Sequence, residues 1–137
     1  MLHTPEELLV LASLIEKETA VPDERPLIAG VFLNRLAKSM KLQTDPTVIY
    51  AITHGNPPLG RPLTRSDLQT PSPYNTYLIT GLPPGPICAP GTQALDAAAH
   101  PARTDALYFV ANGSGGHSFA ATLSEHNQNV SEFRKKH

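Results

Sequence analysis

The first helix is encoded by residues 4–19, which read TPEELLVLASLIEKET. Thr4 and Glu7 have the spacing of a capping box, in which each side chain accepts a hydrogen bond from the other residue's backbone N–H. Pro5 follows the cap at the first helical position, where the missing N–H of proline is not needed. Apolar residues then recur at the spacing of one helix face: Leu8, Leu11, Ala12 and Ile15. The stretch therefore predicts an amphipathic helix that ends at about Thr19.

Further helices and one hairpin are predicted downstream. Helical patterns cover residues 23–39, 45–55 and 92–99 and the segment from Ser124 onward. The first of these buries Ile28, Val31, Phe32 and Leu36, and the second begins with Asp45 as its N-cap. Residues 106–111 and 117–122 have strand character, and the glycine-rich turn between them predicts a hairpin. The predicted fold class is α+β, with N-terminal helices and a late β-hairpin; a lysozyme-like, mainly helical arrangement is the alternative.

A long proline-rich region separates the early helices from the later elements. Most of the 14 prolines of the chain lie between Asn56 and Gly91. The run at 81–86, GLPPGP, is incompatible with a helix interior or a central strand. Because a segment of this length without regular structure is usually functional in a compact domain, we expect it to form a cleft.

Length and composition restrict the class of protein. The 137 residues fit one domain, of which 40% are hydrophobic and 17% charged. A net charge of −1 provides no global attraction for nucleic acid or for an anionic membrane. The single cysteine, Cys88, excludes an internal disulfide and a cysteine-based zinc site. The histidines show none of the spacings typical of zinc motifs, so no metal and no cofactor is predicted.

Two glutamates near the end of the first helix are candidates for acid–base chemistry. Glu16 lies at the edge of the apolar stripe, where partial burial would raise the pKa of a carboxyl group and suit it to act as a general acid. Glu18 is about 200° further around the helix and is expected to point away from that face. The alternative is that both are solvated surface groups.

Polar and aromatic residues near the proline-rich region suit a sugar ligand. Gln43 precedes the third helix and is free to face a cleft, even with Asp45 acting as a helix cap. Tyr74, Asn75, Thr76 and Tyr77 combine aromatic faces for stacking with polar groups for sugar hydroxyls. The alternative for the tyrosines is packing beneath a long loop.

Seven sequence motifs occur in order along nearly the whole chain. They are LASLIEKET (11–19), FLNRL (32–36), LQTDPTVIY (42–50), PYNTY (73–77), GLPPGPI (81–87), AAHP (98–101), and YFV (108–110) with GHSF (116–119). Together they closely resemble the catalytic domain of the endolytic murein transglycosylases, the YceG-like family. The resemblance runs from about Leu8 to Phe133.

The resemblance implies an activity and a set of site residues. Members of the family cleave the β-1,4 bond between N-acetylmuramic acid and N-acetylglucosamine in nascent peptidoglycan strands and leave 1,6-anhydro ends. The first acid of the family's Glu-Lys-Glu-Thr string maps onto Glu16, which would be the general acid and then the base. Glycan contacts are expected from Gln43, Asp45, the segment Tyr74, Asn75, Thr76 and Tyr77, and His117.

The resemblance also implies a cellular setting. The full-length family protein carries an N-terminal transmembrane anchor and a LysM-like domain, and it acts at the periplasmic face of the bacterial inner membrane. Peptidoglycan strands are the expected partner, together with peptidoglycan synthases (penicillin-binding proteins). On this basis residues 1–137 are expected to be a soluble catalytic fragment of a longer protein.

Two other functions stay open at the level of sequence. A muramidase would hydrolyse the same bond with water and would use Asp45 or Asp67 as a second carboxylate. A non-catalytic module would bind glycan strands without shortening them.

Overall fold

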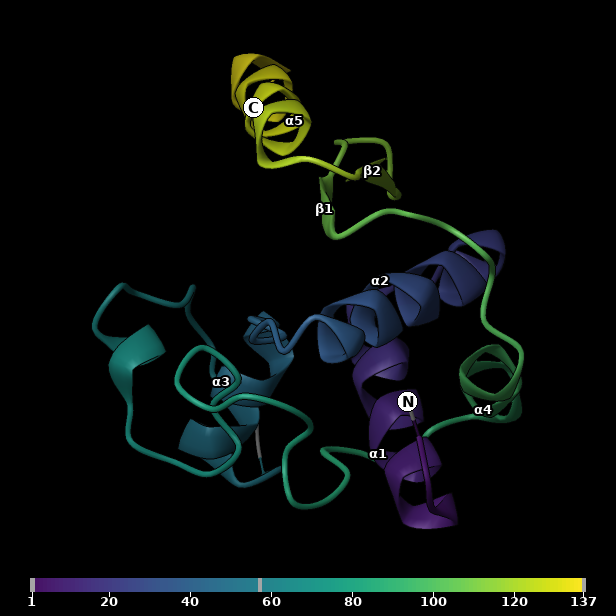
Figure 1. The fold of residues 1–137 in the computed structure, drawn as a ribbon. Coiled ribbons are helices and arrows are strands. Elements are labelled where there is room, and N and C mark those ends of the chain that lie inside the picture. The colour runs from purple at the N-terminus through teal and green to yellow at the C-terminus, as the bar shows by residue number, and fades with distance from the viewer. Residues whose placement is uncertain (1, 57, 137) are drawn as a thin grey trace.

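The computed structural model describes residues 2–56 and 58–136 (Figure 1). Its elements are α1 (Pro5–Glu18), the 3-10 turn η1 (Pro22–Glu24), α2 (Arg25–Ala37), α3 (Asp45–Thr53), the 3-10 turn η2 (Asp67–Gln69), α4 (Thr92–Ala99), β1 (Tyr108–Ala111), β2 (His117–Ala120) and α5 (Leu123–Lys136). The fold class is α+β, as predicted. None of the helices in the described ranges has the length and apolar character needed to cross a bilayer.

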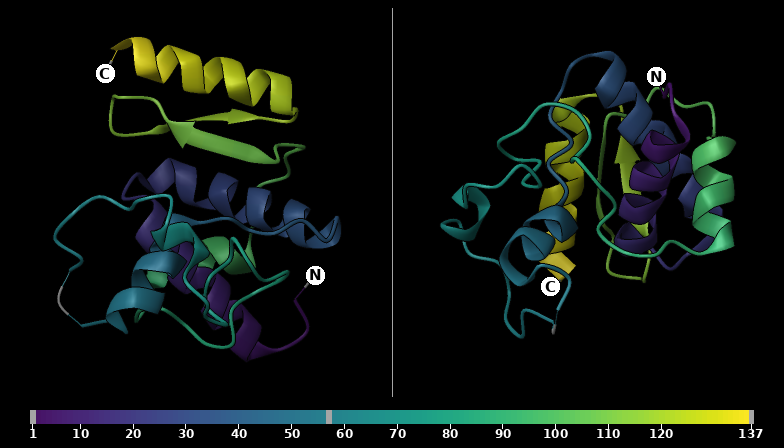
Figure 2. Two further views of the ribbon diagram at one scale, coloured as in Figure 1. Left: turned by 90° about the vertical axis from the view of Figure 1, so that its left-hand side faces the viewer. Right: turned by 90° about the horizontal axis from the view of Figure 1, so that it is seen from below.

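The core is built around α1, which packs against α2 and α4 (Figure 2). The predicted capping box is present, with the Glu7 N–H donating to Thr4 Oγ1 at 3.1 Å and the Thr4 N–H donating to Glu7 Oε1 at 3.0 Å. Fully buried apolar side chains of α1 and α2 supply most of the core: Leu11, Leu14, Ile15, Ile28, Val31 and Phe32. At roughly 1.5–3 kcal/mol for each large apolar side chain, these residues hold the three helices together.

Element boundaries differ from the sequence predictions at two helix starts. The predicted helix 23–39 begins as the 3-10 turn η1 and becomes α-helical only at Arg25. The prediction that Asp45 caps α3 is wrong by one residue, because Thr44 occupies the N-cap and makes no side-chain capping bond. The Asp45 carboxylate instead accepts a hydrogen bond from the Tyr77 hydroxyl at 2.5 Å. A tertiary contact therefore replaces the local cap.

The hairpin and α5 form a second layer beside the helical core (Figure 1). The strands pair antiparallel, with Tyr108 opposite Ala120 and Ala111 opposite His117. The helix α5 packs against both strands, and β1 packs against α2. In the edge-on aromatic pair between these layers, the rings of Phe32 and Phe109 lie 5.8 Å apart.

Side-chain hydrogen bonds hold the proline-rich region in place. The Asn75 amide donates to the carbonyl oxygens of Leu68 and Thr70, each at 2.9 Å. Further along, the Ile87 N–H donates to Ser13 Oγ of α1 at 3.1 Å. These bonds satisfy backbone groups that would otherwise lack partners in a segment without regular structure.

Candidate active site

A small polar cavity of about 160 Å³ lies where the helical core meets the hairpin layer. Its walls come from the end of α1, from α2, from the segment before α3, from the proline-rich region and from the strand region. The lining residues are Glu18, Arg35, Leu42, Gln43, Asp45, Tyr77, Leu107 and Phe109. Five separate segments of the chain thus bring two carboxyl groups, a phenol and a guanidinium to one cavity.

Glu18 is the carboxyl group of this cavity whose pKa is raised by its surroundings. It is the last residue of α1, and Thr44 Oγ1 donates to Glu18 Oε2 at 3.1 Å. Burial raises the pKa of Glu18 to about 7, and the negative charge of Asp45 adds to this effect. The Thr44 hydrogen bond and the charge of His117 act in the opposite direction. A carboxyl group with this pKa can both give and take a proton near neutral pH.

Tyr77 and Asp45 form a hydrogen-bonded pair on the cavity wall. Burial, the bond to Asp45 and the nearby charge of Glu18 all raise the pKa of the Tyr77 phenol, so the hydroxyl keeps its proton. Gln43, the third polar residue of this wall, is exposed and adopts a left-handed backbone conformation with φ of +50°. A side chain such as glutamine tolerates this conformation only at a cost, which the surrounding contacts must offset.

Glu16 lies outside this cavity. Its Oε1 accepts a hydrogen bond from the Gly91 N–H at 2.7 Å and so ties α1 to the segment before α4. A Cβ atom at Gly91 would lie 3.1 Å from the same oxygen, so the absence of a side chain there allows the close approach. The expected orientations are therefore exchanged: Glu18, not Glu16, faces the cavity.

Asn75 and Thr76, which the family resemblance places among the glycan contacts, do not line the cavity. Both residues are 0% exposed. Thr76 Oγ1 accepts from the Thr44 N–H at 2.9 Å and bonds the Thr47 hydroxyl at 2.8 Å. Asn75 uses its amide to bridge the loop and accepts from the Tyr77 N–H at 2.9 Å. These two residues hold Thr44 and Tyr77 in place and have no surface left for a ligand.

Tyr74 and His117 also pack against protein groups. The Tyr74 ring lies 4.8 Å from the Tyr50 ring, as in the alternative of a tyrosine beneath a loop. His117 Nδ1 lies 2.7 Å from Glu24 Oε1, and the His117 N–H donates to Glu24 Oε2 at 2.7 Å. Neither residue lines the small cavity, although the charge of His117 reaches Glu18.

Sequence reasoning missed Arg35 as a site residue. The residue is 8% exposed and follows Ile28, Val31 and Phe32 on the buried face of α2. The sequence could have indicated this role, because Arg35 occupies the next position of the apolar stripe of α2 and arginine is rarely buried without a specific role.

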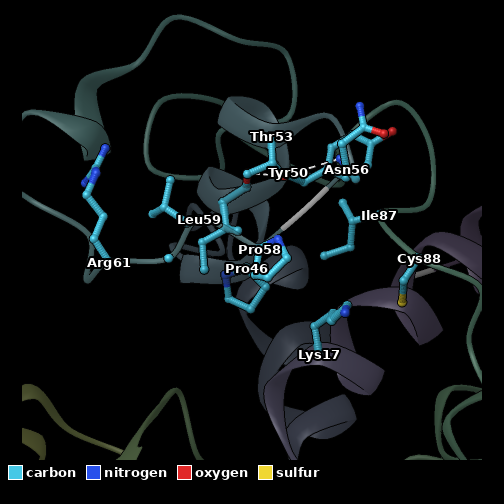
Figure 3. Close-up of a pocket in the computed structure, with 13 residues that line it drawn as sticks. Lys17, Pro46, Tyr50, Thr53, Asn56, Pro58, Leu59, Arg61, Ile87 and Cys88 are labelled. Atoms are coloured by element: carbon cyan, nitrogen blue, oxygen red, sulfur yellow. Dashed lines mark hydrogen bonds between the residues drawn. The ribbon is translucent and has the colours of Figure 1, made fainter.

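A second cavity, of about 670 Å³, is larger and more open than the first (Figure 3). It is bounded by Lys17 of α1, by α3, by the loop around Leu59 and by Ile87 and Cys88. Lys17 and Pro46 directly adjoin Glu18 and Asp45 in the chain, so the two cavities flank the same helix ends. Arg61 at the rim is held by a salt bridge to Asp67, with N–O distances of 2.6 and 3.1 Å.

Within the described residues, no group of three or more histidine, cysteine, aspartate or glutamate side chains has the arrangement of a metal site. The cavity combines the Glu18 carboxyl group, whose pKa is about 7, with hydrogen-bonding groups on its walls.

Comparison with known proteins defines the family. The family model described as "YceG-like family" matches residues 1–132. A protein named endolytic murein transglycosylase from Bacillus subtilis is 50% identical over 123 residues, which are 89% of this chain and 33% of that protein. The protein of the same name from Streptococcus pneumoniae is 41% identical over 135 residues, covering 94% of this chain and 24% of that protein.

A solved structure agrees with the sequence matches. The crystal structure of a YceG-like protein from Listeria monocytogenes superimposes with a TM-score of 0.83 at 48% identity, covering 90% of this chain and 39% of that one. The α+β fold is thus shared with this solved structure. The chain belongs to the YceG-like family, which confirms the resemblance seen in the sequence. It spans about a third or less of the length of the curated relatives that it matches.

Proposed function

We propose that this domain cleaves the glycan strands of murein as an endolytic transglycosylase. Two findings support the proposal: relatives of 41–50% identity carry that name, and a carboxyl group with a pKa of about 7 faces a cavity lined with polar groups. The raised pKa of buried Glu18 is the single observation that supports the proposed chemistry. An acid that is still protonated near neutral pH is what cleavage of a glycosidic bond requires.

In this proposal Glu18 takes the role that the family resemblance assigned to Glu16. Protonated Glu18 donates its proton to the glycosidic oxygen as the bond from C1 of N-acetylmuramic acid breaks, which releases the alcohol of the next sugar. The Glu18 carboxylate then removes the proton from the C6 hydroxyl of the same muramic residue while that oxygen attacks C1. The product is a 1,6-anhydro ring, and Glu18 is protonated again at the end of the cycle.

The internal nucleophile explains why one acid–base carboxyl group is enough. Glycosidases that use water or a covalent intermediate need two carboxyl groups. Here the second carboxylate of the cavity, Asp45, already accepts the hydrogen bond from Tyr77. In this proposal Asp45, Tyr77 and the exposed Gln43, which line the cavity, contact sugar hydroxyls, and Asn75 and Thr76 hold the backbone of Tyr77 and Thr44 in position.

The cellular setting follows from the proposed substrate. Because murein lies outside the cytoplasmic membrane, we propose an extracytoplasmic site of action. We also propose that the full-length protein is held at the membrane by an N-terminal anchor, carries a LysM-like domain and works beside peptidoglycan synthases. Fractionation of cells that express the full-length protein, followed by crosslinking to those synthases, tests these assignments.

Two matched variants test the catalytic proposal. Purified peptidoglycan strands are digested with the wild type, Glu18→Gln and Glu16→Gln, and the products are analysed by mass spectrometry. We expect Glu18→Gln to lose activity by about 10²–10⁴-fold, as is typical of a lost general acid, whereas Glu16→Gln keeps most of it. The reverse result would return the role to Glu16.

The mass of the products separates the remaining functions. Anhydro ends are about 18 Da lighter than reducing ends, because no water is added across the broken bond. Reducing ends would identify a muramidase. Strands that bind to the wild type and are never shortened would identify a non-catalytic glycan-binding module.

A further inference from the structure

Arg35 is a buried cation without a counter-ion in the described part of the chain. Its Nε donates to the Leu107 carbonyl oxygen at 2.6 Å and its Nη1 donates to the Lys41 carbonyl oxygen at 2.8 Å. Both acceptors are neutral backbone groups. The ion pairs within the described residues join other side chains: Arg61–Asp67, His100–Asp96 and His117–Glu24. Burial lowers the pKa of Arg35, as expected for a charge removed from water without a carboxylate partner.

The guanidinium group is held in one orientation. Its Cζ lies 5.1 Å from the centre of the Tyr108 ring, and that ring in turn stacks on His126 of α5 at 5.0 Å. With two hydrogen bonds and an aromatic ring fixing its plane, the group loses little further freedom when it binds a ligand.

Arg35 lines the cavity and has N–H donors that its two hydrogen-bond partners do not use. A guanidinium has five N–H donors, and the two hydrogen bonds leave three without a partner in the described structure. Among the residues that the structure describes, the buried side-chain nitrogens without a partner are Arg25 Nε and His126 Nδ1. Nη2 of Arg35 is not among them, so it remains accessible, and Arg35 lines the cavity beside Glu18 and Tyr77.

Glu18 does not neutralise Arg35. An ion pair with arginine would hold the pKa of a carboxyl group below its usual range. The pKa of Glu18 is instead raised, and its direct partner is the Thr44 hydroxyl. The acid and the cation therefore share a cavity without satisfying each other, and Arg35 remains available to a ligand.

We propose that Arg35 determines substrate specificity by binding the acyl oxygen of the lactyl group of N-acetylmuramic acid. This inference rests on the proposed function, since murein is the glycan that carries such a group. A fixed guanidinium prefers a carboxylate or carbonyl oxygen to a sugar hydroxyl. The lactyl group is also what distinguishes the muramic residue from N-acetylglucosamine, so this contact would set which of the two sugars lies beside Glu18.

The wild-type chain alone provides the first test. Binding of three sugars is followed by NMR titration: N-acetylmuramic acid, its lactyl amide and N-acetylglucosamine. We expect the acid and the amide to bind about ten- to a hundredfold more tightly than N-acetylglucosamine, the value of one or two hydrogen bonds to a charged donor. Equal affinity for all three sugars would overturn the proposal, because this is the result expected if Arg35 instead holds the acetamido group that the three sugars share.

Substitution of Arg35 provides the second test. Arg35→Gln should bind the three sugars equally, Arg35→Lys should recover part of the preference for the acid, and the exposed Arg103→Gln serves as the matched control. On glycan strands Arg35→Gln should raise KM more than it lowers kcat. If folded Arg35→Gln keeps the wild-type preference, the assignment is wrong. Failure of the proposed function itself would look different: the wild type would prefer the lactyl sugars and still produce no anhydro ends.

Discussion

Glu18→Gln is expected to stabilise the fold at neutral and alkaline pH. The substitution keeps the size of the side chain and an oxygen that can accept from Thr44 Oγ1, but it removes the carboxyl group that must ionise in a buried position. The free-energy cost of that ionisation follows from the pKa of Glu18, which burial raises from 4.5 to about 7.

The magnitude follows from proton linkage. Each unit of pKa corresponds to about 1.4 kcal/mol, so the rise amounts to about 3 kcal/mol. At pH below 4.5 the carboxyl group is neutral in both states and adds nothing. Between pH 4.5 and 7 the folded chain keeps a proton that the unfolded chain has lost, so the wild type loses stability as pH increases. Above pH 7 the full cost is present and no longer changes.

Urea unfolding of both proteins between pH 4 and 8.5 measures this effect. Because all other titrating groups are common to the two chains, the difference in free energy of unfolding isolates Glu18. The difference should grow by about 3 kcal/mol in favour of Glu18→Gln between pH 4.5 and 7.5. Stability curves that run parallel over this range would refute the assignment of Glu18 as a buried acid, and with it the main support for the catalytic proposal.

Three further substitutions test other contacts of the site. Thr44→Val removes a hydrogen bond that favours ionised Glu18, so the alkaline limb of the pH–rate profile should move upward by about half to one pH unit. Asn75→Ala leaves two loop carbonyl groups without their donor, and urea unfolding should show a loss of about 2–3 kcal/mol. Gly116→Ala places a Cβ atom 2.5 Å from Glu24 Oε2, and Glu24 can move aside only by giving up its hydrogen bonds to His117, so the same assay should show a loss of about 1–3 kcal/mol; unchanged stability would contradict this reasoning.

Sequence patterns formed by residues a few positions apart predicted the helices and the hairpin well. The capping box of α1 and the range of α4 depend on residues a few positions apart, and both match the structure. The hairpin was also found, although the strands are shorter than predicted, because its pairing is determined by a short turn and by residue types beside it.

The candidate site was harder to predict because its environment comes from distant segments. A helical wheel places Glu18 away from the apolar face of α1, but Thr44 and the residues at the start of β1 enclose it from another side. Likewise, the side-chain amide of Asn75 is suited both to binding a sugar hydroxyl and to bridging buried backbone groups. Its type in the sequence does not distinguish these roles, whereas its burial does.

The helical core and the layer formed by the hairpin and α5 need not unfold locally at the same time. Leu107 and Phe109 belong to the hairpin side of the cavity, whereas Glu18 belongs to the helical core. Side-chain contacts hold the hairpin layer against the core, among them the Glu24–His117 pair. Local opening at the boundary between the two layers requires less free energy than global unfolding. Amide protons of β1, β2 and α5 should therefore exchange with solvent as one group, earlier than those of α1, and each opening would momentarily uncover the acid.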